Sequence, residues 1–195
     1  MNDKQKNEEP LVIFNKHDCK MIRLKTNSYL FQYEISNERI LLEKIFNLEF
    51  IKLVYEINKQ DIFDDFNLDI HDETRATVYI LFKHFFGDFG FAQKFAHLDI
   101  TIEKTENRIL FTSETNYTNP SNITLIPTTE LLPISNATAV CNFVNPHKVS
   151  IVTTLNFNYN IDLPEFVEKL ATTIISKVFL RTKQFIEKVN ITNIA

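Results

Sequence analysis

Alternating hydrophobic and polar positions run through most of the chain. Residues 19–26 and 29–35 both alternate with a period of two, and Asn27 and Ser28 between them are typical of a turn. Because successive side chains of a strand point to opposite faces, this alternation predicts strands with one buried face. Five further segments show the same pattern: residues 74–86, 92–104, 108–115, 137–144 and 148–158. We therefore expect an antiparallel sheet.

Hydrophobic positions three and four residues apart predict a shorter helical segment near residues 37–57. It follows Ser36, a residue type that caps helix N-termini, and its apolar positions are clearest over residues 37–47. The continuation, residues 49–57, is apolar at both periods and fits either more helix or a strand. Residues 61–73 are rich in aspartate and are interpreted as an acidic linker.

The C-terminal part of the chain predicts one long helix. Asp162 is an N-cap residue, Pro164 fits the first turn, and Glu165 completes a capping box in all but the usual Ser or Thr. The apolar positions that follow lie close to one stripe: Leu163, Val167, Leu170, Ile174, Val178, Phe185 and Val189. At ~1.5 Å per residue this helix is roughly 40 Å long, enough to cross a whole sheet.

The two glycines of the chain enclose the letters DFG, which in protein kinases mark a magnesium-binding loop. The other kinase motifs, a glycine-rich loop, a strand lysine and a catalytic HRD-type loop, are missing from this sequence. Gly87 and Gly90 instead separate two alternating segments, where glycine supplies the positive φ of a tight turn. We therefore expect a hairpin turn at residues 87–90, with a mobile aromatic loop at a pocket mouth as the alternative.

A turn centred on Asp88 and Phe89 fixes which residues pair across this hairpin. Phe82 would then lie opposite Phe95, and Ile80 opposite His97. This register places one set of side chains on a single face of the sheet: Phe82, His84, Phe86, Phe95 and His97.

Metal and cofactor chemistry finds little support in the motifs. His84, His97 and Asp99 lack a further ligand at suitable spacing for a tetrahedral site, so both histidines are interpreted as structural or pocket-rim residues. Asp65 begins an imitation of a calcium-binding loop, but Ile70 and Ala76 stand where Gly and Glu are needed. No nucleophile elbow, phosphate loop or dinucleotide fingerprint occurs. We expect no catalytic residue, no metal and no cofactor.

Length and composition indicate one α+β domain spanning residues 11–195, preceded by a polar disordered tail, residues 1–10. The net charge of −4 gives no indication of nucleic-acid binding, and no apolar run is long enough to span a membrane. The N-terminus does not resemble a signal peptide, so we expect a cytoplasmic protein. Cys19 and Cys141 are then buried free thiols in a reducing compartment.

The residue usage also indicates the kind of genome. Asn, Ile, Lys, Phe and Tyr, which have AT-rich codons, are abundant, whereas Gly, Ala, Arg and Pro are scarce. We infer an AT-rich genome, such as that of a parasite, a symbiont or a large DNA virus. The 18 phenylalanines partly reflect this codon bias, so they are weaker evidence for an apolar pocket than their number suggests.

The order of the expected elements resembles the helix-grip fold of START-like, birch-pollen-allergen-like and polyketide-cyclase-like proteins. The resemblance covers residues 20–189 and is most specific over residues 148–187, where a last strand turns into a long amphipathic helix opened by LPEF. It implies a curved antiparallel sheet with a long C-terminal helix packed across it. In that superfamily the sheet and helix enclose an apolar cavity, and most members bind lipids, sterols or other hydrophobic molecules.

Two main functional hypotheses follow. The first is a non-enzymatic carrier of a hydrophobic small molecule or lipid, bound in a cavity between the sheet and the C-terminal helix. Its candidate ligand-binding residues are Phe82, Phe95, Phe143, Phe157 and Tyr159, with His84, His97 and Tyr159 as polar groups. The second is a protein–protein interaction or assembly protein, such as a viral structural or accessory protein, with a filled core. Residues 116–146, whose only charged residue is Glu130, would be its partner surface. A small enzyme acting on a hydrophobic substrate is the third.

Overall fold

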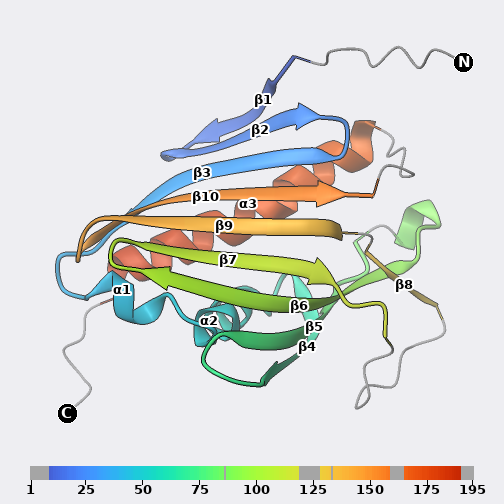
Figure 1. Ribbon diagram of the computed structural model, residues 1–195. Helices are drawn as coiled ribbons and strands as arrows, with labels where there is room; N and C mark the ends of the chain where they lie inside the picture. Colours follow the sequence, from blue (N-terminus) through green and yellow to red (C-terminus); the bar gives the residue numbers. More distant parts are fainter. Residues whose placement is uncertain (1–8, 86, 119–127, 133, 159–164, 190–195) are drawn as a thin grey trace, which may run out of the picture.

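One continuous sheet, with helices on one of its faces, forms the body of the protein (Figure 1). The computed structural model describes residues 9–85, 87–118, 128–132, 134–158 and 165–189. The strands of the described part are β1 (Leu11–Lys16), β2 (Cys19–Lys25), β3 (Ser28–Ser36), β4 (Phe63–Ile70), β5 (Arg75–Phe82), β6 (Gln93–Thr105), β7 (Arg108–Thr115), β8 (Thr129–Leu131), β9 (Ile134–Asn145) and β10 (Lys148–Phe157). Its α-helices are α1 (Leu42–Ile45), α2 (Glu49–Asn58) and α3 (Glu165–Lys188).

The strands follow the order β1-β2-β3-β10-β9-β7-β6-β5-β4, and each neighbouring pair is antiparallel. The short strand β8 lies off this path and pairs with β6 in parallel. Strand β10 pairs with β3, so the end of the chain closes back onto its beginning. The expected fold class, an α+β curved antiparallel sheet with a long C-terminal helix packed across it, is confirmed.

The helices divide the inner face of the sheet between them. In Figure 1 the long helix α3 runs diagonally behind β3, β10 and β9. Its Phe179 packs on Phe31 and Tyr33 of β3. Helix α2 packs on the other half, where Tyr55 stacks on Phe66 of β4. Between them lies the main core, whose largest fully buried side chains include Phe46 and Ile151.

The buried face of α3 differs from the stripe expected from its apolar residues. Thr172, Ser176, Thr182 and Ile186 are buried, and Phe179 packs beside them, whereas Phe185 of the expected stripe is 43% exposed. Ile174 and Val178 are only partly buried, and Val189 packs against the core as expected. Leu163, the capping box around Asp162, and the side chains of Val167 and Leu170 lie outside the described residues.

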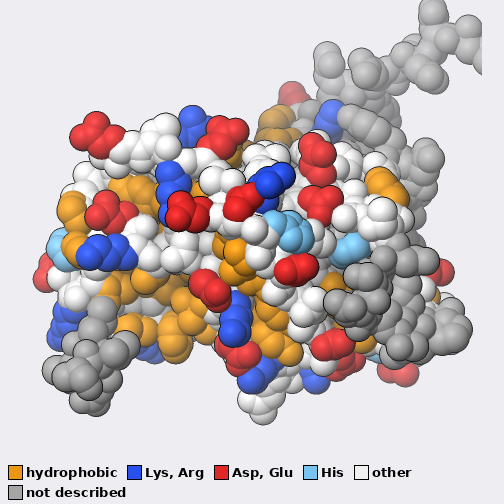
Figure 2. All heavy atoms as spheres, turned by 60° about the horizontal axis from the view of Figure 1, so that its bottom comes forward, with side chains coloured by type: hydrophobic (Ala, Val, Ile, Leu, Met, Phe, Trp, Pro, Cys, Tyr) orange, Lys and Arg blue, Asp and Glu red, His pale blue; other side chains and the backbone are white. Residues whose placement is uncertain are grey.

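The segment between β3 and β5 holds most of the other corrections. Ser36 ends β3, so it is not a helix cap, and the first helix is confined to α1. The ambiguous run that follows is helical, as α2. The expected acidic linker is wrong, because its residues form the edge strand β4. Seen from this edge in Figure 2, acidic and basic side chains are interspersed with hydrophobic ones. Charges along an edge strand oppose pairing with another chain.

The glycine turn is confirmed, but the register of its hairpin is wrong by one residue. Gly90 has φ +78°, and its N–H donates to the carbonyl of Gly87 at 2.9 Å. The connection includes a single 3₁₀ turn, and the last paired residues are Leu81 and Phe95. Because Tyr79, and not Ile80, lies opposite His97, the expected common face of residues 82 and 95 does not exist. A slip of one residue moves a strand's side chains to the other face.

Two further expectations can be compared with the structure. Cys19 and Cys141 are both buried and free, as predicted. No helix in the described part of the chain is long and apolar enough to cross a membrane. The expected disordered tail, residues 1–10, lies almost entirely outside the described residues.

Candidate functional site

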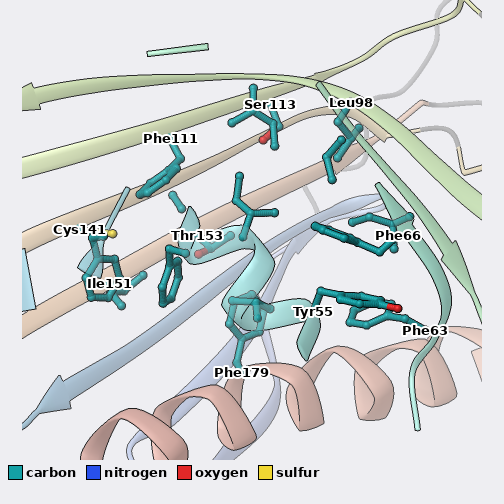
Figure 3. Close-up of a pocket in the computed structure, with 18 of the residues that line it drawn as sticks. Tyr55, Phe63, Phe66, Leu98, Phe111, Ser113, Cys141, Ile151, Thr153 and Phe179 are labelled. Atoms are coloured by element: carbon teal, nitrogen blue, oxygen red, sulfur yellow. The ribbon is translucent and has the colours of Figure 1, made fainter. Parts of the chain in front are cut away.

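A cavity of about 270 Å³ lies between the inner face of the sheet and the helices α2 and α3 (Figure 3). Residues of β3, β4, β5, β6, β7, β9 and β10 form its floor, α2 forms most of its roof, and Phe179 of α3 forms one wall. Its lining is almost wholly apolar. Eight aromatic rings surround it: Tyr33, Phe46, Phe50, Tyr55, Phe63, Phe66, Phe111 and Phe179.

The hollow arises because small side chains occupy the centre of the sheet's inner face. Ala139 of β9 pairs with Phe111 on one side and with Thr153 on the other. Ser113, two residues further along β7, also faces the cavity. Protein interiors are normally packed as densely as organic crystals, so small residues flanked by large rings leave space that the rings cannot enter.

Helix α2 closes the cavity on the side away from α3. Phe50, Ile51, Val54 and Tyr55 face the sheet, at the spacing of one side of a helix. The ring of Tyr55 stacks on Phe66 with centroids 4.4 Å apart, so α2 is held against the edge strand β4 (Figure 3). Offset stacking of this kind contributes about 0.5–1.5 kcal/mol beyond the area buried.

Helix α3 is fixed at both ends by polar contacts with residues 23–37, in and just after the strands β2 and β3. Glu168 accepts hydrogen bonds from the Tyr29 hydroxyl at 2.6 Å and from Arg23 Nη1 at 3.0 Å. At the other end the amide of Asn37 donates to the carbonyls of Ile186 and Val189 at 2.6 and 2.9 Å. These carbonyls belong to the last turn, where no intrahelical donor remains. The cavity wall contributed by α3 is therefore rigidly positioned.

Among the described residues, no charged side chain lines the cavity, and burial disfavours the ionised forms of two lining residues. Burial, with smaller contributions from Cys141 and Cys19, raises the pKa of Tyr33 well above its ordinary value. Burial raises the pKa of the Cys141 thiol to about 12. A thiol with so high a pKa is a poor nucleophile, since the thiolate is the reactive form.

One buried hydroxyl belongs to a residue of the cavity lining. The hydroxyl oxygen of Thr153 is shielded from solvent and forms no hydrogen bond within the described residues. A buried hydroxyl left unpaired costs about 1–3 kcal/mol. Ser113 is the other residue of the floor that carries an aliphatic hydroxyl.

The residues expected to bind a ligand are dispersed. Phe95 and His97 lie on the outer face of the sheet. Phe95 packs on Tyr79, and His97 Nδ1 lies 2.9 Å from the carbonyl oxygen of Thr118. His84 is exposed beyond the end of β5, with Nε2 2.6 Å from the carbonyl oxygen of Phe91.

The other expected residues lie on the inner side, but outside the cavity lining. The ring of Phe82 packs on the cavity residue Phe63, and Phe143 packs edge-on against Phe46. Phe157 packs edge-on against Tyr29. Tyr159 lies outside the described residues. A binding role for these side chains stays a prediction.

Sequence reasoning missed the cavity residues on α2 and β4. In the acidic segment Phe66, Leu68 and Ile70 alternate with Asp65, Asn67 and Asp69. That period-two pattern marks an edge strand, and the density of aspartate obscured it. Ser113 and Thr153 carried no signal of their own, because hydroxyl residues are common on strands.

The sheet gripped by one long C-terminal helix, with an apolar cavity between them, defines the helix-grip class of α+β folds. Solved structures with this fold include human StAR-related lipid transfer protein 5, which matches with a TM-score of 0.71 and 10% identity over 92% of this chain and 86% of that one. The lipid transfer and protein localization domain of human StarD13 matches with a TM-score of 0.68 and 7% identity over 92% and 90%. A STAR-related lipid transfer protein from Xanthomonas axonopodis matches with a TM-score of 0.63 and 9% identity over 93% and 100%.

At such low identities these similarities establish the fold alone, and that fold is START-like. The resemblance expected from the order of elements is thereby confirmed at the level of architecture. No protein-family model matches the sequence, and no curated protein matches it either.

Proposed function

We propose that the protein binds a hydrophobic small molecule or lipid in the cavity between the sheet, α2 and α3, without catalysing a reaction on it. The observation that carries this proposal is the apolar cavity of about 270 Å³ in the centre of the fold. Ligand pockets are typically about 300–1,000 Å³ and mostly apolar, so the cavity is apolar like them and slightly smaller than their usual range. The START-like architecture adds support, because similar structures are named as lipid transfer proteins.

The chemistry of the lining favours binding over catalysis. General acid–base catalysis needs a titratable group within hydrogen-bond reach of the substrate. The described residues of the lining include no His, Asp, Glu, Lys or Arg, and the Cys141 thiol is protonated at neutral pH. A bound molecule would therefore leave unchanged.

The alternative, a protein-binding surface within residues 116–146, has one observation in its favour. Tyr117 is 71% exposed and Val144 is 64% exposed, at the two ends of this stretch. Exposed apolar residues mark interaction sites when they form a contiguous patch. Glu130, its one charged residue, forms an ion pair with Lys94 of β6. Much of the stretch lies outside the described residues, so the cavity carries the stronger argument.

The test is to fill the cavity from its floor. Ala139→Leu adds three carbon atoms where β9 faces the cavity, and Val140→Leu adds one on the outer face of the same strand. We expect the native protein and Val140→Leu to bind an apolar fluorescent probe equally, and Ala139→Leu to bind it at least tenfold more weakly. Native mass spectrometry of the freshly purified chain should show a co-purified small molecule that Ala139→Leu lacks.

Equal probe binding by folded Ala139→Leu and native protein would contradict the cavity as the site. Thermal unfolding provides a second measurement, since a ligand present at 100 times its Kd stabilises the folded state by about 2.7 kcal/mol. The native protein and Val140→Leu should both show this stabilisation, and Ala139→Leu should not.

A further inference from the structure

The volume of the cavity limits the size of the molecule that it can hold. An apolar protein cavity of about 150 Å³, lined by Leu, Ile and Phe, holds one benzene molecule, which is about 25 Å³ for each carbon atom. A water molecule occupies ~30 Å³ in the liquid. By these two measures the 270 Å³ of this cavity hold about nine to eleven non-hydrogen atoms. A whole membrane lipid is several times larger.

The walls of the cavity are rings that pack on one another. In α2, the ring of Phe50 stacks on Phe46 with centroids 4.5 Å apart, and the ring of Tyr55 stacks on Phe66 of β4 with centroids 4.4 Å apart. On the opposite side, Phe179 of α3 packs on two rings of β3 (Figure 3). A larger ligand would have to separate these stacks, because close-packed side chains leave no spare room around them.

A charged ligand group would find no counter-charge in the cavity. None of the described residues that line it is Asp, Glu, His, Lys or Arg. Lys183, the cation near Cys19, is engaged elsewhere: its ammonium group donates to the carbonyl of Glu34 and to the Glu187 carboxylate, both at 2.6 Å. Burying an unpaired carboxylate or ammonium in apolar surroundings is strongly unfavourable. The lining therefore favours an uncharged molecule.

We propose that the ligand is a compact, uncharged and largely hydrocarbon molecule of about nine to eleven non-hydrogen atoms, and not a whole lipid. This inference rests on the proposed function and adds the size and charge of the ligand to it.

The size is tested with a series of alkylbenzenes, from toluene to hexylbenzene, which differ by one CH₂ at each step. Headspace gas chromatography measures the free concentration of each compound above a solution of the full chain, and so its affinity. Each added CH₂ should tighten binding by about fourfold, the value for burying one such group. The affinity should rise as far as propylbenzene or butylbenzene and then level off, because further CH₂ groups remain in water.

The charge is tested with two molecules of the same shape, isobutylbenzene and phenylacetate, each with ten non-hydrogen atoms. Phenylacetate is ionised at pH 7.4. Isothermal titration calorimetry should show it binding at least about a hundredfold more weakly than isobutylbenzene, since its carboxylate would be buried without a partner.

Substitutions in the lining should move the size limit. Leu98 of β6 lines the cavity, and Leu98→Ala removes three carbon atoms from the lining, so the affinity should level off about three carbons later. Leu110→Ala is the matched control. Leu110 precedes the cavity residue Phe111 on β7 and faces the other side of the sheet, so the limit should stay where it is. Ala139→Val adds two carbon atoms to the floor and should bring the limit about two carbons earlier.

An affinity that rises by the same factor through to hexylbenzene would overturn this inference and leave the proposed function standing. Equal binding of phenylacetate and isobutylbenzene, or a limit that neither Leu98→Ala nor Ala139→Val moves, would overturn it in the same way. If no alkylbenzene binds while Ala139→Leu still weakens probe binding, the ligand class is wrong and the cavity is right. If the native protein does not bind the probe either, both proposals are wrong.

Discussion

The hydroxyl of Tyr29 in β3 donates a hydrogen bond of 2.6 Å to Oε1 of Glu168 in α3. The two residues are 139 positions apart in the chain, and Arg23 holds the other carboxylate oxygen of Glu168 at 3.0 Å. Tyr29 is 5% exposed, so this contact lies where water competes little. It anchors the N-terminal half of the helix that walls the cavity.

Tyr29→Phe should therefore destabilise the protein by about 1.5–3 kcal/mol, the range for a hydrogen bond to a charged group. Tyr33→Phe is the matched control. It lies on the same face of β3, and its hydroxyl forms no hydrogen bond within the described residues. The free energy of unfolding in urea, at neutral pH, measures both. Equal losses from the two substitutions would show that the contact with Glu168 contributes nothing.

The face of α3 that packs on the sheet can be tested in the same way. Phe179 contacts Phe31 and Tyr33 with ring centroids 4.9 and 5.2 Å apart, whereas Phe185 is 43% exposed. Phe179 is partly buried, so Phe179→Ala should cost about 3 kcal/mol, the lower end of the range for buried rings, and Phe185→Ala less than about 1 kcal/mol. Urea unfolding of the two variants decides the matter. A larger loss of stability from Phe185→Ala would show that α3 buries the face predicted from its apolar residues.

That stripe was misread for a physical reason. The buried face of α3 holds Thr172, Ser176 and Thr182 beside its apolar residues. Two of these hydroxyls donate to carbonyls four residues earlier, Thr172 to Glu168 at 2.7 Å and Thr182 to Val178 at 2.8 Å. A helix can bury Ser and Thr in this way without a partner elsewhere. Counting apolar residues alone therefore turns the predicted face away from the real one.

The strands were easier to predict than their pairing. Six of the segments with period-two alternation overlap β2, β3, β5, β6, β7 and β10 almost residue for residue, because alternation depends only on the sequence of one strand. Register depends on the connection between two strands. The turn around Gly90 continues into a longer loop, so Leu81 pairs with Phe95 and the expected face is lost. The wrong register also affected the predicted site, because it placed Phe95 and His97 on the inner face of the sheet.

Gly90 itself provides a prediction about that loop. Its φ of +78° is unfavourable for any other residue, yet a Cβ placed there would meet nothing within 4 Å. Gly90→Ala should thus cost about 1–2 kcal/mol from backbone strain alone, and Gly90→Asn less. At Gly87 a Cβ would come within 3.1–3.2 Å of the His84 ring, which is exposed and can move aside. Gly87→Ala should be nearly neutral. The free energy of unfolding of both alanine variants can be measured by chemical denaturation. Equal values would show that backbone strain at residue 90 costs nothing.

The cavity thiol provides a prediction about alkaline pH. Burial raises the pKa of Cys141 from an ordinary value of 9.0 to about 12. The unfolded chain therefore ionises this thiol at lower pH than the folded protein does. Stability is unaffected below pH 9 and falls as the pH rises from 9 towards 12, because ionisation favours the unfolded state. From pH 8 to pH 10 the loss due to this one group is about 1.4 kcal/mol.

Cys141→Ala removes that loss and isolates it from other groups. Tyr33 and Tyr29 also have raised pKa values, so both proteins lose further stability as their tyrosines ionise in the unfolded chain. The difference between native protein and variant, measured by urea unfolding in the presence of a reductant, should shrink by about 1.4 kcal/mol between pH 8 and pH 10. The variant begins less stable, since a small buried side chain is lost, and approaches the native protein as the pH rises. A difference that stays constant would mean that water reaches Cys141, and with it the floor of the cavity.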